Sequence, residues 1–145
     1  MRTLAVWIVV FTIAVVASAA KDEAVEVLKS KVESTPVQDQ APLCVRIAQL
    51  QLRNVDTLYT EGHVEQARDA LHDIVVYSAK ARDTAKTSRK HLKRVEIDVR
   101  KMAEKLADIK RTLAFDDQPP VEEAIQRLQE IRTTLLEEMF KKEKK

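Results

Sequence analysis

Residues 64–113 read VEQARDALHDIVVYSAKARDTAKTSRKHLKRVEIDVRKMAEKLADIKRTL, and this stretch decides the fold. Uncharged residues recur in it at alternating steps of three and four, with no Gly or Pro between them. The fifteen repeat positions are Val64, Ala67, Leu71, Ile74, Ser78, Ala81, Ala85, Ser88, Leu92, Val95, Val99, Met102, Leu106, Ile109 and Leu113. A seven-residue repeat of this length predicts one long helix of about 75 Å with coiled-coil-like packing.

The middle of this stretch, SAKARDTAKTSRKH (78–91), contains no large aliphatic residue. One interpretation is that the neighbouring helices are too short to reach residues 84–91, which are left uncovered. Another is that the small side chains let the same helix of a second copy cross closely in a symmetric dimer. The pattern leaves open whether the long helix is continuous or breaks near 84–91.

Two helices flank the long one and are expected to pack antiparallel to it as helical hairpins. The first, about 42–61, has Pro42 in its first turn and ends at Gly62, a residue suited to a left-handed helix cap. The second, about 119–140, follows the DDQPP turn (116–120) and has one nonpolar face: Val121, Ile125, Leu128, Ile131, Leu135 and Met139. Residues 21–34 predict a short first helix, and 34–42 predict a linker.

Composition supports an all-α class. Among 145 residues Gly occurs once, aromatic residues are 4% and charged residues are 33%. We therefore expect a single elongated helical domain over 42–140, followed by a basic tail over 141–145. The net charge of +2 is too small to indicate a nucleic-acid partner.

The N-terminus has the three-part layout of a secretory signal peptide. Arg2 precedes the nonpolar run LAVWIVVFTIAVV (4–16), and the small residues ASAA (17–20) follow it. We predict export to the periplasm or the extracellular space, with cleavage after Ala19 or Ala20. The alternative is an uncleaved membrane anchor, because residues 4–20 just reach the length that spans a bilayer.

Cys44 is the only cysteine, so the chain cannot form an internal disulfide. Its nonpolar neighbours Leu43, Val45 and Ile47 favour a buried thiol. The alternative in an oxidising compartment is a disulfide between two chains.

Residues 58–71 resemble the middle of a tetratricopeptide repeat. Gly62 corresponds to the glycine of the turn, Ala67 to the small residue where the two helices approach, and Leu71 to the larger residue four positions on. No second copy follows, so the resemblance implies one helical hairpin and no peptide-binding array. The chain as a whole resembles uncharacterised secreted bacterial helical proteins, which implies no activity.

The sequence gives little support to catalysis, since it contains no phosphate-binding loop, nucleophile elbow or zinc-protease motif. His63, Asp69 and His72 could form a weak metal site, but the charged neighbours of both histidines favour exposed positions. A haem-binding bundle is a distant alternative, because Met102 and Met139 lie on nonpolar faces where core packing explains them. We expect no cofactor and no metal.

One cluster of charge is a candidate binding site. Between residues 80 and 94 seven cations face Asp83 alone: Lys80, Arg82, Lys86, Arg89, Lys90, Lys93 and Arg94. The simplest interpretation is a solvated helix surface. The functional one is a site for an anionic lipid headgroup, a polysaccharide or an acidic protein; without aromatic residues, nucleic acid is disfavoured. We predict a non-enzymatic structural or adaptor protein of the cell envelope that acts through protein contacts, or else a module that binds an anionic envelope component.

Overall fold

Helices account for almost all of the described chain. The computed structural model describes the backbone of residues 11–141 and the side chains of residues 21–141. Within that part there is no strand, and the elements are α1 (Phe11–Ser34), α2 (Val37–Thr60), α3 (Val64–Ser88), α4 (Leu92–Thr112), the 3-10 helix η1 (Phe115–Asp117) and α5 (Gln118–Phe140). The predicted all-α class is confirmed.

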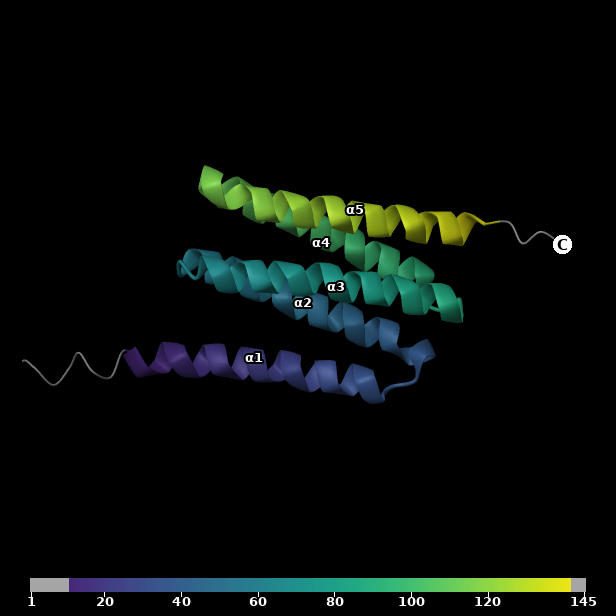
Figure 1. Ribbon diagram of the computed structural model, residues 1–145, viewed down its shortest axis with the longest axis horizontal. Coiled ribbons are helices and arrows are strands. Elements are labelled where there is room, and N and C mark those ends of the chain that lie inside the picture. The colour runs from purple at the N-terminus through teal and green to yellow at the C-terminus, as the bar shows by residue number, and fades with distance from the viewer. Residues whose placement is uncertain (1–10, 142–145) are drawn as a thin grey trace, which may run out of the picture.

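Successive helices run in opposite directions and lie side by side (Figure 1). α1 lies at one side, the α2–α3 pair is in the middle, and the α4–α5 pair is at the other side. α3 contacts both α2 and α5, while α2 contacts α1 and α4. The start of α2, the α3–α4 turn and the end of α5 therefore share one end of the bundle (Figure 1).

The long helix expected over 64–113 is two helices. α3 ends at Ser88, and Arg89 and His91 adopt the left-handed conformation, with φ of 59° and 66°. Neither residue is a glycine, so the sequence carries no ordinary signal for this break. The turn sends α4 back antiparallel to α3, which replaces one helix of 75 Å by two of about half that length.

The repeat itself is nevertheless the core-facing surface of both helices. Eleven of its fifteen positions are buried, and the other four, Val64, Ser88, Leu92 and Leu113, are half-buried. Three residues of turn separate Ser88 from Leu92, so each helix turns its own part of the repeat, which we call the seam, toward the core. The pattern correctly predicts which residues face the core, although it does not show the break.

The thin seam, by which we mean the part of the seam with small side chains in 78–91, is buried. Both interpretations of it, an uncovered surface and a crossing with a second copy, are wrong. Ser78, Ala81 and Ala85 have no exposed surface, and Thr84 is only 7% exposed. Because α4 folds back, α5 runs alongside α3 and covers it together with α2. Small side chains let the helices approach closely, so the seam is not available for a crossing with a second copy.

The linker predicted at 34–42 is also wrong, because α2 begins at Val37 and Pro36 precedes it as the N-cap residue. Pro42 lies inside α2 and not in its first turn. Pro42 has no backbone N–H, so one carbonyl near the start of the helix lacks its helical hydrogen bond. Because Pro42 is exposed, water can reach this carbonyl. On α1, Val25 and Val32 are buried against the rest of the bundle.

Gly62 lies in the turn between α2 and α3 with φ of 80°, the conformation that its position predicts. Ala67 and Leu71 are buried at the start of α3, as the hairpin requires. Cys44 is free and buried, which confirms that expectation, and burial raises the pKa of its thiol to about 11. Met102 is buried on the seam of α4.

The signal peptide predicted at 1–20, with its cleavage site, lies outside the residues whose side chains are described, and most of the basic tail lies outside them too. None of the helices in the described part of the chain is both long and nonpolar enough to cross a membrane.

Candidate functional site

Six exposed cations gather where α3, α4 and α5 meet at one end of the bundle. We call this surface the basic end; it consists of Lys86, Arg89, Lys90, Lys93, Arg94 and Lys141. The left-handed turn at Arg89 and His91 places the last turn of α3 beside the first turn of α4. α5 adds Lys141, the residue that follows its last turn.

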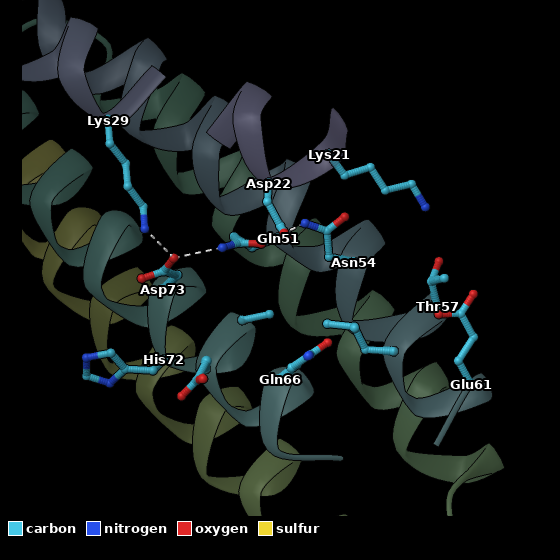
Figure 2. Close-up of a pocket in the computed structure, with 13 residues that line it drawn as sticks. Lys21, Asp22, Lys29, Gln51, Asn54, Thr57, Glu61, Gln66, His72 and Asp73 are labelled. Atoms are coloured by element: carbon cyan, nitrogen blue, oxygen red, sulfur yellow. Dashed lines mark hydrogen bonds and ion pairs between the residues drawn. The ribbon is translucent and has the colours of Figure 1, made fainter. Parts of the chain in front are cut away.

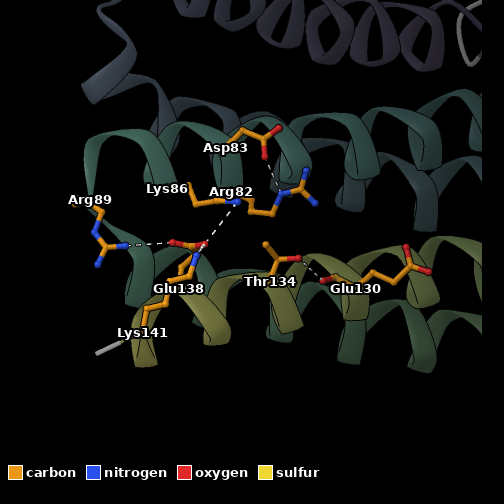
Figure 3. Close-up of polar contacts among 8 residues, drawn as sticks. All are labelled: Arg82, Asp83, Lys86, Arg89, Glu130, Thr134, Glu138 and Lys141. Carbon is orange, nitrogen blue, oxygen red and sulfur yellow. Dashed lines mark hydrogen bonds and ion pairs between the residues drawn. The ribbon is translucent and has the colours of Figure 1, made fainter. Parts of the chain in front are cut away.

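Glu138 of α5 is the centre of one half of the basic end. Its carboxylate lies 3.2 Å from Nη1 of Arg89, 2.9 Å from Nζ of Lys141 and 3.6 Å from Nζ of Lys86. The four side chains point toward one another across the α3–α5 contact (Figure 3). Hydrogen bonding and charge from Lys141, with the charge of Lys86, lower the pKa of Glu138 despite its burial.

Two of the seven predicted cations, Lys80 and Arg82, lie outside the basic end, and Arg94 belongs to it without contacting Glu138. Arg82 is paired with its neighbour Asp83 at 2.8 Å, and Arg94 is paired with Asp98 of α4 at 3.0 Å. Lys80 is half-buried, and its charge opposes the burial effect on the pKa of Cys44, which places it toward α2. The structure thus brings Lys86 and Arg89 together and leaves Lys80 on another side of α3.

Lys90 and Lys93 are the free charges of the basic end. Both are exposed, and neither has a carboxylate within 4 Å among residues 21–141. The site can therefore attract an anion without first breaking an internal ion pair. Long lysine side chains suit a diffuse anionic surface better than one rigidly shaped ligand.

Sequence reasoning missed Glu138 and Lys141 as members of this cluster. They lie about fifty residues from Arg89 along the chain and join it only because α5 runs beside α3. The only hint was the position of Glu138 next to Met139, at the edge of the nonpolar face of α5.

A second candidate is a pocket of about 560 Å³ between α1, α2 and α3 (Figure 2). In its wall Lys29 Nζ and Gln51 Nε2 both donate to Oδ2 of Asp73, at 2.9 and 2.7 Å. The amide of Asn54 donates in turn to Gln51 at 2.8 Å. These polar groups bind one another and tie α1 to the α2–α3 hairpin.

The metal site considered for His63, Asp69 and His72 is not assembled. Asp69 and His72 line the pocket, while His63 lies 3.8 Å from Glu61 in the α2–α3 turn. Across the side chains that the structure describes, no three His, Cys, Asp or Glu residues are grouped as metal ligands.

Comparisons with known proteins give no relative: no family model, no curated protein and no solved structure matches the chain.

Proposed function

We propose that this protein is an exported, non-enzymatic helical adaptor of the cell envelope, and that its basic end binds an anionic envelope component. The observation that carries the proposal is that six exposed cations lie at the ends of α3, α4 and α5 that share one end of the bundle. The signal-like N-terminal sequence supports the location in the envelope.

The arrangement of the other charges supports an adaptor over an enzyme. Three of the described ion pairs outside the Glu138 contacts join different helices: Lys29 with Asp73, Glu96 with Arg132, and Lys110 with Glu122. These pairs hold the helices in place, whereas Lys90 and Lys93 of the basic end are exposed and pair with no carboxylate among residues 21–141. An anionic partner gains long-range attraction and rapid encounter from such a surface.

Binding to dextran sulfate, a soluble polyanion, tests the proposal directly. The variant Lys90→Glu/Lys93→Glu reverses two charges that pair with no described carboxylate and so leaves the Glu138 contacts intact. Lys101→Glu/Lys105→Glu makes the same charge change at exposed positions farther along α4.

Fluorescence titration at low salt is expected to show binding by the unchanged protein and by the 101/105 control. The 90/93 variant should bind at least about tenfold more weakly, since each lysine near an anionic surface contributes about 1 kcal/mol. Equal weakening in both variants would show a response to net charge alone and would refute a site at the basic end. Absence of binding by the unchanged protein would refute the proposal as well.

A further inference from the structure

Phe140 is a large nonpolar side chain exposed beside the basic end. It is the last residue of α5, directly before Lys141, and 75% of its surface faces solvent. Two residues earlier on the same helix, Glu138 points into the bundle. Because successive helical residues turn by about 100°, Phe140 projects from the opposite side of α5, away from α3.

The basic end is the blunt end of the bundle and not a groove between helices. The α3–α4 turn lies between the end of α5 and the start of α2. On the α5 side Arg89 contacts Glu138, and on the α2 side His91 and Arg94 line a shallow pocket together with Pro42 and Arg46. Val37, the first residue of α2, is 52% exposed at this same end. Cations and nonpolar side chains therefore share one end surface.

We infer that the basic end docks on an anionic lipid bilayer, with Phe140 inserted among the headgroups. This inference rests on the proposed function and names the partner of that same site. Lysine and arginine side chains are attracted to anionic headgroups by about 1 kcal/mol each. An aromatic ring beside them gains further free energy at the boundary between headgroups and acyl chains.

A bilayer explains Phe140 where other polyanions do not. A sulfated or phosphorylated polysaccharide in water offers the cations the same charges but offers an exposed phenylalanine no nonpolar phase. An acidic protein would need a pocket for the ring at one fixed place, whereas a bilayer accepts it anywhere.

The chain offers a matched control at the other end of the bundle. Phe115, in the α4–α5 connection, is 84% exposed and lies far from the basic end (Figure 1). If the protein bound bilayers only through nonpolar contact, Phe140 and Phe115 would insert equally. A bilayer that is recognised at the basic end contacts Phe140 and leaves Phe115 in water.

The test places an environment-sensitive fluorophore at each position through Phe140→Cys and Phe115→Cys in the full chain. Labelling is selective, because Cys44 is buried and the pKa of its thiol is raised to about 11. Each label reports the surroundings of its own residue, whatever the N-terminal segment does at the membrane. The probes are vesicles of phosphatidylcholine with and without phosphatidylglycerol.

We expect the label at 140 to brighten and shift to the blue with phosphatidylglycerol vesicles and to stay unchanged with phosphatidylcholine alone. The label at 115 should stay unchanged with both, and Lys90→Glu/Lys93→Glu should remove the response at 140. An equal response at both positions, or none at 140, would overturn bilayer docking. If dextran sulfate still bound the basic end in that case, the proposed function would survive; if it did not, both would fail.

Discussion

Arg89, in the turn after α3, donates a hydrogen bond from Nη1 to Oε2 of Glu138 near the end of α5, across 3.2 Å. The two residues are forty-nine positions apart in the sequence. Lys86 and Lys141 face the same carboxylate, so a single acid holds three cations at the contact between α3 and α5. Glu138 is thus the internal counter-charge of the basic end.

Replacing this acid tests its role in stability. Glu138→Gln leaves the three cations without a counter-charge, so it should lower the free energy of unfolding at pH 7, measured with urea. The pKa of Glu138 is lowered by folding. Its contribution is therefore fully present above the unfolded pKa, near 4.5, and is lost as the pH falls through the folded value.

Wild type and Glu138→Gln should accordingly converge in stability as the pH falls below the lowered pKa of Glu138. Glu137→Gln is the control, because Glu137 is exposed and forms no described ion pair. A constant stability difference between wild type and Glu138→Gln from pH 7 to pH 3 would contradict the ionic role.

The close contact of α3 with its neighbours makes Ala81 intolerant of a larger side chain. Ala81 has no exposed surface, so Ala81→Leu should overpack the core and destabilise the protein by about 1–3 kcal/mol. Thr87→Leu, at an exposed position of the same helix, should change stability by no more than about 0.5 kcal/mol. Equal effects in thermal unfolding would mean that the thin seam is uncovered after all.

The seam shows what the sequence can predict and where it stops. Periodicity identifies core-facing residues because burial acts on every helical turn, and Val95, Val99, Met102 and Leu106 are all buried as expected. Gly62 marks its turn because only glycine adopts a φ of 80° without strain. The path of the chain between Ser88 and Leu92 follows from neither rule.

At that break, Arg89 and His91 take a conformation that their side chains disfavour, so the packing of α4 against α5 and α2 must determine it. The local backbone preferences of these residues do not depend on such tertiary contacts. The error then spreads: with one continuous helix, α5 cannot reach α3, the small seam is left uncovered, and Glu138 meets neither Lys86 nor Arg89. One turn of three residues separates the predicted long helix from the observed pair of α3 and α4.

Backbone strain at His91 gives a direct test of the turn. His91→Gly removes the side chain that opposes a φ of 66° and should leave stability unchanged or slightly higher. His91→Val should be about 1–2 kcal/mol less stable than His91→Gly, because a β-branched residue is poorly tolerated in this conformation. As a contrast, Lys101→Gly within α4 should destabilise by about 1 kcal/mol. A continuous helix would instead make His91→Gly as harmful as Lys101→Gly.

The Cys44 thiol should be unreactive in the folded protein. It has no exposed surface, and burial raises its pKa from 9.0 to about 11, which lowers the thiolate fraction at pH 8 about a hundredfold. A colorimetric thiol reagent should therefore react with Cys44 only after urea is added, whereas Phe115→Cys should supply one thiol that reacts at once. Rapid reaction of Cys44 without urea would contradict its burial.

Lys29 fastens α1 to the rest of the bundle. Burial alone would lower its pKa, but hydrogen bonds and charge from Asp73 and Glu26 outweigh that effect and the pKa is raised. Its ammonium also lies 5.8 Å from the ring centre of Tyr77, so the side chain contacts α3 twice. Lys29→Met keeps the nonpolar stem but leaves Asp73 with Gln51 as its remaining donor.

We expect Lys29→Met to lower the free energy of local unfolding of α1 by about 1–2 kcal/mol, a value between those typical of exposed and of buried ion pairs. Since 1.4 kcal/mol is a factor of ten, amides of residues 21–34 should exchange with deuterium about ten times faster, while α4 and α5 keep their rates. Lys31→Met, at an exposed position of the same helix, should leave exchange unchanged. If Lys29 holds α1 locally, α1 should open while the other helices stay folded. Faster exchange throughout the bundle would instead show that α1 unfolds only together with the other helices.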